Sequence, residues 1–469
     1  MSAPWLEPWN LALLNRPVIE AMLAMALFIA IALSRRSSAR EAHKRGSRIL
    51  DGRAAQRRTA RLRVLRAEPP LTMAGVAIAP GDEVKHFKLI GTTGTGKSTA
   101  IRELLAAALD RGDRAVITDP DGGYLARYYD PGRGDVILNP FDPRSLQWDP
   151  FAEVRESCDA EQLASSLIPS TEDASGREWR GYARTFLAAV VRRCHEMGSR
   201  NAGELWRLIA MAPSAELRPL VANTPAQPFL EPENARMFGS IRSVAGSAAA
   251  ALQHVQAQRA RPFSVRDWTG SGYGALFLPY QASQIAALRT VIATWARLAI
   301  FATMEDGDES GDRRLWLIVD ELDALGAIDG LKDALARLRK FGGRCVLGFQ
   351  SVAQVSSTYG AGDAQTIVEN CANTLILRCS ASEHGGTSQF ASRLIGEREV
   401  VRRSTSRGRD GSGFPGGRGW RRSMNTSEQR VTEAAVLASE LEQLPDLNGY
   451  LKTASSPFWL RVRLRVGSG

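Results

Sequence analysis

Cysteine and histidine are scarce in this sequence. Its 469 residues include five cysteines and five histidines, and no two cysteines form a C-x-x-C pair. A disulfide frame and a zinc site are therefore excluded as organising features, and the cysteines are expected to be small buried residues in a reducing compartment. Aromatic residues make up only 7%, but 44% of the residues are hydrophobic, which suffices for a large core. This length predicts about three structural units.

Most of the chain has nearly equal numbers of basic and acidic residues. The net charge is +10, yet residues 67–469 carry 47 basic and 46 acidic residues. The excess lies in residues 34–66, which hold twelve basic and two acidic residues. Nucleic-acid binding through charge is therefore expected only there and at a second patch near Arg402–Arg422. The first segment equally suits a positive flank of a membrane helix or contact with anionic lipid headgroups.

Long apolar runs are absent apart from Val18–Leu33. As a helix this run spans about 24 Å, against roughly 30 Å of membrane hydrocarbon. Basic residues follow the run, whereas in a secretory signal peptide they precede it. We predict a transmembrane helix with a short outer N-terminus and the rest of the chain in the cytoplasm. A buried or amphipathic core helix is the alternative.

A phosphate-binding loop is the most specific motif in the chain. It follows a short apolar strand, Phe87–Ile90, and precedes a helix with apolar residues at helical spacing. Glycines in such a loop let backbone N–H groups point at phosphates, and the helix N-terminus adds partial positive charge. Lys97 is expected to reach the β- and γ-phosphates and the Ser98 hydroxyl to bind Mg²⁺. The predicted nucleotide-binding residues are Gly91, Thr92, Thr93, Gly94, Thr95, Gly96, Lys97, Ser98 and Thr99.

Two further strand ends carry chemistry. The apolar strand Leu315–Val319 ends in Asp320 and Glu321, which are expected to hold Mg²⁺ and to act as general base, respectively. Alone, either acid could cap the next helix; together with the phosphate loop the pair is strong evidence. A later strand ends in Gln350, where a γ-phosphate sensor would lie; a glutamine that simply closes the strand is the alternative. No guanine-reading N-K-x-D tetrapeptide is present, so we expect ATP, not GTP.

The order of strands and helices predicts a mostly parallel α/β sheet interrupted by an all-helical stretch. The last segment, from Trp459, alternates and is expected to be an edge strand. The predicted parts are an outer tail 1–17, a transmembrane helix 18–33, a basic juxtamembrane linker 34–66, a nucleotide-binding domain in two parts (67–148 and 263–469), an inserted all-α domain 149–262, and a mobile Arg/Gly-rich loop 402–424.

Several segments carry a family resemblance. GTTGTGKST, RRLWLIVDELDAL, LARLRKFGGRCVLGFQSVAQVSSTYG and ASELEQLPDLNGYLK occur in this order. The chain resembles the type IV coupling proteins of bacterial conjugation (the TraD/TrwB group) over about residues 71–465. The resemblance implies a RecA/FtsK-like ATPase that forms a homo-hexameric ring at the bacterial inner membrane. The family typically has two membrane helices, whereas this chain has room for one.

The resemblance also implies roles for single residues and partners. Lys97 and Ser98 match the phosphate and Mg²⁺ residues, Asp320 and Glu321 match the second nucleotide motif, and Gln350 matches the sensor. Arg339 matches the family's trans-acting arginine, with Arg344 as runner-up; from the residues alone, a solvated helix face is the alternative. The implied partners are single-stranded and also double-stranded DNA, bound without strong sequence specificity, relaxase and other relaxosome proteins, components of the type IV secretion channel, and the membrane.

Three functions are compatible with these features. The first is a DNA-dependent ATPase that couples relaxase-bound single-stranded DNA to the secretion channel. The second is a nucleotide-switched platform that recruits DNA and protein substrates without processive pumping, which the near-neutral body favours. The third, a duplex-unwinding helicase, is disfavoured because no further helicase motif accompanies the ATP site.

Overall fold

The computed structural model describes residues 42–65, 69–170, 174–199, 201–305, 314–381, 386–410 and 421–466, together with Met25. The predicted outer tail and transmembrane helix lie outside these ranges, apart from Met25. The described chain divides into two compact units, which we treat separately. The first comprises residues 1–47 and 396–435, and the second residues 48–395 and 436–469.

The second unit is built on a ten-stranded sheet in the order β7-β10-β6-β11-β12-β5-β13-β16-β17-β2. All pairings from β7 to β13 are parallel, which confirms the predicted α/β fold. Central strands such as β11 are apolar throughout because helices cover both faces of a parallel sheet. The strands are β2 (Ile49–Asp51), β5 (Phe87–Ile90), β6 (Arg114–Pro120), β7 (Val136–Ile137), β10 (Ala275–Tyr280), β11 (Leu315–Val319), β12 (Gly343–Phe349), β13 (Asn373–Ile376), β16 (Asn448–Lys452) and β17 (Trp459–Arg463).

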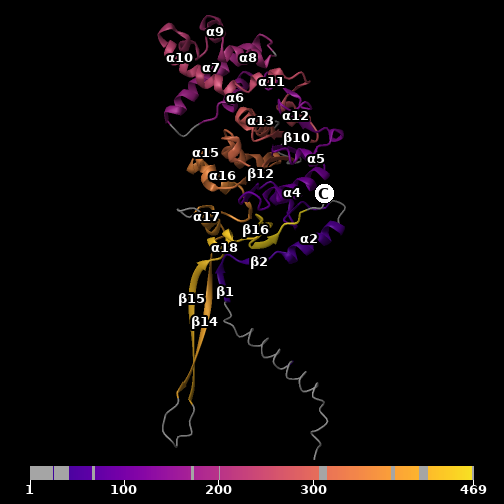
Figure 1. Cartoon of the computed structure of the whole chain (residues 1–469), viewed down its shortest axis with the longest axis vertical. Coiled ribbons are helices and arrows are strands. Elements are labelled where there is room, and N and C mark those ends of the chain that lie inside the picture. The colour runs from indigo at the N-terminus through magenta and orange to yellow at the C-terminus, as the bar shows by residue number, and fades with distance from the viewer. Residues whose placement is uncertain are drawn as a thin grey trace, which may run out of the picture. The chain divides into compact units, whose positions relative to one another are not determined.

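Helices between these strands carry the rest of the core (Figure 1). In α4, residues at spacings of three and four, from Ile101 to Leu109, are buried against the sheet. Within the described residues, α13 is the one helix long and apolar enough to span a membrane, and it is mostly buried inside the unit. The helices are α2 (Arg53–Leu65), α3 (Pro80–Glu83), α4 (Lys97–Asp110), α5 (Leu125–Tyr128), α12 (Val265–Ser271), α13 (Ile285–Glu305), α14 (Leu331–Leu338), α15 (Val352–Tyr359), α16 (Ala361–Asn370), α17 (Gly386–Ile395) and α18 (Ala438–Glu442).

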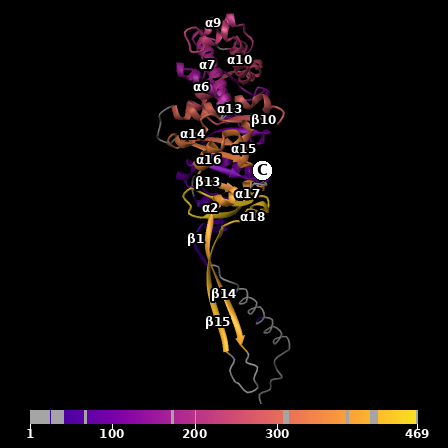
Figure 2. The same cartoon turned by 90° about the vertical axis from the view of Figure 1, so that its left-hand side faces the viewer.

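An all-helical insert lies at one end of this unit (Figures 1 and 2). Short strands β8 (Gln147–Trp148) and β9 (Pro262–Phe263) pair in parallel where the chain leaves and rejoins the sheet domain. Trp148 is buried and packs edge-on against Trp295 of α13, which anchors this junction. The insert consists of α6 (Ser157–Leu167), α7 (Ala174–Glu196), α8 (Ala202–Ala210), α9 (Ser214–Val221), α10 (Ala235–Ala249) and α11 (Leu252–Ala257).

The first unit contains a three-stranded antiparallel sheet. Its order is β1-β14-β15, with β1 at Ala42–Gly46, β14 at Glu397–Asp410 and β15 at Arg421–Ala434. Strands β14 and β15 form a long two-stranded ribbon (Figure 2). Most of the predicted mobile loop 402–424 therefore belongs to paired strands. Arginine and glycine content was a poor guide here, because ladder hydrogen bonds between polar strands need no apolar residues.

Two other expectations are corrected by the observed strands and helices. The segment expected as a basic linker, 34–66, contains β1, β2 and α2. Strand β2 pairs in parallel with β17, so that Trp459 lies opposite Ile49. The C-terminal strand β17 is therefore second from the edge, and β2 is the edge strand. Sequence alternation in β17 could not show this, because the partner strand lies about 400 residues earlier in the chain.

Candidate functional site

The predicted phosphate loop lies between β5 and α4. Gly94 and Gly96 have φ angles of +77° and +117°, which only glycine adopts without strain. A side chain at Gly96 would also meet Leu464 at 2.8 Å, whereas one at Gly94 would meet nothing within 4 Å. The loop backbone thus packs against Leu464 at Gly96 and is open to its surroundings at Gly94. This is the shape that a row of N–H groups needs in order to bind phosphate.

Lys97 begins α4 inside this loop. Its Nζ donates to the carbonyl oxygens of Gly91 at 2.6 Å and Thr92 at 3.2 Å, and the side chain is only 6% exposed. Burial lowers the pKa of Lys97, while the carboxylates of Asp320 and Glu321 oppose that shift. The ammonium is therefore held where a phosphate oxygen bound by the loop would meet it.

Ser98 and Asp320 meet although 222 positions separate them. The Ser98 hydroxyl donates to Asp320 Oδ2 at 2.6 Å. The other carboxylate oxygen, Asp320 Oδ1, is buried and has no hydrogen-bond partner among the described residues. A buried, unpaired carboxylate oxygen beside a hydroxyl is a pair of hard oxygen ligands, which Mg²⁺ prefers. The residues present therefore fit Mg²⁺, because Ser98 and Asp320 together offer two oxygen atoms that could hold the ion.

Glu321 and Gln350 form the polar end of the same site. Gln350 Nε2 donates to Glu321 Oε1 at 3.1 Å, and the Thr93 hydroxyl donates to Gln350 Oε1 at 2.9 Å. Gln350 thus connects the tip of the phosphate loop to the second acid. Burial and the neighbouring charge of Asp320 raise the pKa of Glu321, as suits a proton acceptor.

The structure separates the two candidate arginines. Arg339 is exposed in a 3-10 turn, Arg339–Phe341, just before β12. Gln350 follows the other end of β12, about 23 Å away at 3.3 Å per residue. Arg339 is therefore not part of the nucleotide site of its own subunit. It could act only in the site of a neighbouring subunit.

Arg344 is unsuited to that role, because it is buried. Its guanidinium pairs with Glu83 at 3.3 Å, donates to the Gly342 carbonyl oxygen and lies over the Trp316 ring. Only 6% of the residue is exposed, so it cannot reach a neighbouring subunit. The runner-up interpretation of Arg344 is thus excluded.

Sequence reasoning missed the turn after β6. Asp119 accepts hydrogen bonds from the backbone N–H groups of Tyr124 at 3.0 Å and Leu125 at 2.6 Å. Burial raises the pKa of Asp119 to about 6. The Tyr124 hydroxyl donates to Asp320 Oδ2 at 2.8 Å. The sequence did contain a signal: Asp119 lies near the end of β6, and β6 pairs with β11, the strand that precedes Asp320.

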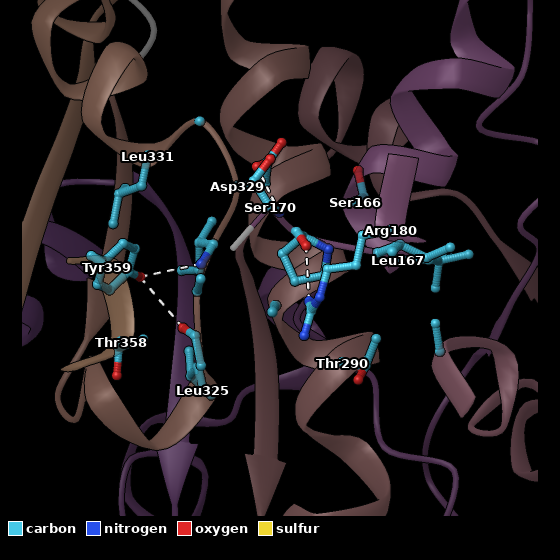
Figure 3. Close-up of a pocket in the computed structure, with 18 of the residues that line it drawn as sticks. Ser166, Leu167, Ser170, Arg180, Thr290, Leu325, Asp329, Leu331, Thr358 and Tyr359 are labelled. Carbon is cyan, nitrogen blue, oxygen red and sulfur yellow. Dashed lines mark hydrogen bonds between the residues drawn. The ribbon is translucent and has the colours of Figure 1, made fainter. Parts of the chain in front are cut away.

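The segment after Glu321, residues 325–333, lies opposite the helical insert. Both line a cavity of about 1030 Å³, and this segment forms one of its walls (Figure 3). Half-buried Tyr359 accepts a hydrogen bond from the backbone N–H of Ile328 at 3.2 Å. Asp329 accepts one from the backbone N–H of Ser170 at 3.3 Å, just before α7. The wall is thus bonded directly to the insert.

Comparisons with known proteins agree with this fold. Coupling protein TraD of Escherichia coli (strain K12) is 31% identical over 399 residues, which cover 83% of this chain and 53% of TraD. The solved structure of plasmid coupling protein TrwB in complex with ADP and Mg²⁺ is 30% identical, with a TM-score of 0.79, over 92% of this chain and 96% of that chain. TrwB in complex with the non-hydrolysable GTP analogue GDPNP is also 30% identical, with a TM-score of 0.78 and the same coverage.

A family model also matches most of the chain. A family model described as the type IV secretion-system coupling protein DNA-binding domain matches residues 70–465. The matched range includes the phosphate loop, the Asp320–Glu321 pair, Gln350 and the whole helical insert. The chain spans about half the length of TraD. Because the family model covers most of the sequence, the chain belongs to the type IV secretion-system coupling proteins.

Proposed function

We propose that this protein is an Mg²⁺-dependent ATPase. The supporting observation is the hydrogen bond between Ser98 and Asp320, with Glu321 next in the chain. It brings the phosphate loop and the acidic strand end into one site. The same fold in TrwB is solved with ADP and Mg²⁺, which supports nucleotide and cofactor alike. TrwB is also solved with a GTP analogue, so preference for ATP is tested by competition with GTP.

The residues divide the work of hydrolysis. Lys97 and the N–H groups of the loop neutralise and orient the β- and γ-phosphates. Bound Mg²⁺ supplies further charge neutralisation, with Ser98 and Asp320 as its protein ligands. Glu321 accepts the proton of the attacking water, since its raised pKa keeps it a better base than an exposed glutamate. Gln350 orients Glu321 and is linked to the loop through Thr93.

We further propose that hydrolysis is coupled to DNA transfer in conjugation. On this proposal, a homo-hexamer anchored in the bacterial inner membrane through the apolar run at 18–33 connects relaxase-bound single-stranded DNA to a type IV secretion channel. Family membership and the likeness to TraD support this role. The bond between Asp329 and the segment before α7 supports communication between the nucleotide site and the insert.

Single-stranded DNA is expected to stimulate the ATPase rate of the full-length protein by about tenfold or more. The physical reason is that backbone binding by basic groups is strong and sequence-tolerant, so any single strand should engage the motor. The rate is measured against DNA concentration at low and high salt, and stimulation should fall as salt rises. Equal rates with and without DNA contradict the motor and favour the nucleotide-switched recruitment platform.

Arg339→Ala is expected to lower the ATPase rate about a thousandfold, because the arginine completes the site of the next subunit. Arg337→Ala, an exposed arginine two residues earlier, serves as the control and should leave the rate unchanged. When Arg339→Ala and Glu321→Gln subunits are mixed, some subunit contacts combine the intact Glu321 of the first variant with the intact Arg339 of the second. In randomly mixed rings the rate should recover to roughly a quarter of the wild-type value. An inactive mixture contradicts the trans role.

A further inference from the structure

The turn after β6 directs a tyrosine side chain into the nucleotide site. Asp121 and Gly122 have positive φ angles of 60° and 72°, which reverse the chain sharply. Both carboxylate oxygens of Asp119 then bond to the backbone N–H groups of Tyr124 and Leu125. The turn is fixed at both ends, and as a consequence Tyr124 is only 2% exposed.

The Tyr124 hydroxyl and the Ser98 hydroxyl share one acceptor. Both donate to Asp320 Oδ2, at 2.8 Å and 2.6 Å. Two donors from different elements fix this oxygen and, with it, the plane of the carboxylate. The second oxygen, Oδ1, is left without a partner among the described residues, although it is buried. The pair of donors therefore determines which oxygen of Asp320 is free and where it points.

Two features keep the phenol in this role. The phenol is buried beside Asp320, and its hydroxyl carries the one hydrogen that it donates to that carboxylate. The guanidinium of Arg102, from α4, lies over the phenol ring at 5.6 Å. The ring is thus held between the turn and the helix that carries Lys97 and Ser98. Movement of either element would move the donor.

We propose that Tyr124 is a positioning residue for the Mg²⁺ carboxylate: it fixes Asp320 so that Oδ1 meets the cation held by Ser98. This inference rests on the proposed nucleotide hydrolysis. Groups that hydrogen-bond to a metal-binding carboxylate set its orientation and commonly change metal affinity about tenfold or more when removed. The role proposed is positioning and not catalysis, because the Tyr124 hydroxyl acts through Asp320, to which it donates at 2.8 Å.

The test is Tyr124→Phe, which removes one oxygen atom and keeps the ring. In the presence of ADP, the affinity of the full-length protein for Mn²⁺, measured by electron paramagnetic resonance of free Mn²⁺, should fall about tenfold. ADP binding without divalent cation should stay unchanged, because the loop and Lys97 are intact. The Mg²⁺ concentration for half-maximal hydrolysis should rise by the same factor, with most of the rate regained at high Mg²⁺.

Tyr128→Phe is the matched control. Tyr128 lies one turn later and donates to the Arg102 carbonyl oxygen at 3.0 Å, so it loses a comparable bond without touching Asp320. Its Mn²⁺ affinity should equal that of the wild type. If Tyr124→Phe fails to fold, Asp119→Asn, which loosens the turn but keeps the phenol, should weaken Mn²⁺ binding in the same direction. Wild-type Mn²⁺ affinity in the Tyr124 variant, or in Asp119→Asn if the first does not fold, overturns the inference. A wild-type protein that binds Mn²⁺ and ADP but hydrolyses nothing instead contradicts the proposed function.

Discussion

Glu321→Gln is expected to lower the turnover number for ATP by about a hundredfold or more, while nucleotide binding is retained. The substitution is isosteric and keeps a carbonyl oxygen that can accept the hydrogen bond from Gln350, now made at 3.1 Å to Glu321 Oε1. The geometry of the site is therefore preserved. What disappears is the ability to accept a proton from water, since a neutral amide is a very poor base.

The measurement pairs steady-state turnover with the affinity for a fluorescent ADP analogue. Glu369→Gln provides a matched control, because Glu369 also accepts a hydrogen bond from a glutamine amide, that of Gln365 at 2.8 Å, but lies on an exposed helix face. Both variants lose one negative charge and keep one acceptor. Turnover above half of the wild-type value in Glu321→Gln would assign the base to another group.

The sequence was most informative where function depends on local structure. A glycine turn between an apolar strand and a helix can be recognised from consecutive residues, and so can two acids ending an apolar strand. Their meeting at Ser98 and Asp320 follows because carboxyl ends of parallel strands lie at one edge of a sheet. The site was thus predictable as two halves, and the fold rule joined them.

Other features depend on distant partners and could not be predicted. Arg339 and Arg344 look alike in the sequence, but Arg344 lies within the buried strand β12, where its guanidinium pairs with the distant residue Glu83. Tyr124 reaches Asp320 because Asp121 adopts a positive φ angle, which no periodicity reports. The polar ribbon of β14 and β15 was mistaken for a loop because composition ignores cross-strand register.

Glu83→Gln is expected to destabilise the second unit by about 3 kcal/mol, because removing one partner of a buried ion pair leaves the other charge uncompensated. Glu83 accepts hydrogen bonds from both terminal nitrogens of Arg111, at 3.0 and 2.9 Å, and also forms an ion pair with buried Arg344. Arg111 keeps Asp113 as a partner in the variant. Arg344 loses its ion-pair partner and retains the Gly342 carbonyl oxygen, the face of a tryptophan ring and the charge of Asp113.

Urea unfolding followed by tryptophan fluorescence measures this loss, and one of the ten tryptophans, Trp316, lies beneath Arg344 in the cluster. Glu216→Gln is the control: Glu216 also meets an arginine through both oxygens, but on the surface of the insert, where solvent screens the pair, so its midpoint should not move. Equal midpoints for the two variants would show that burial adds nothing to this ion pair.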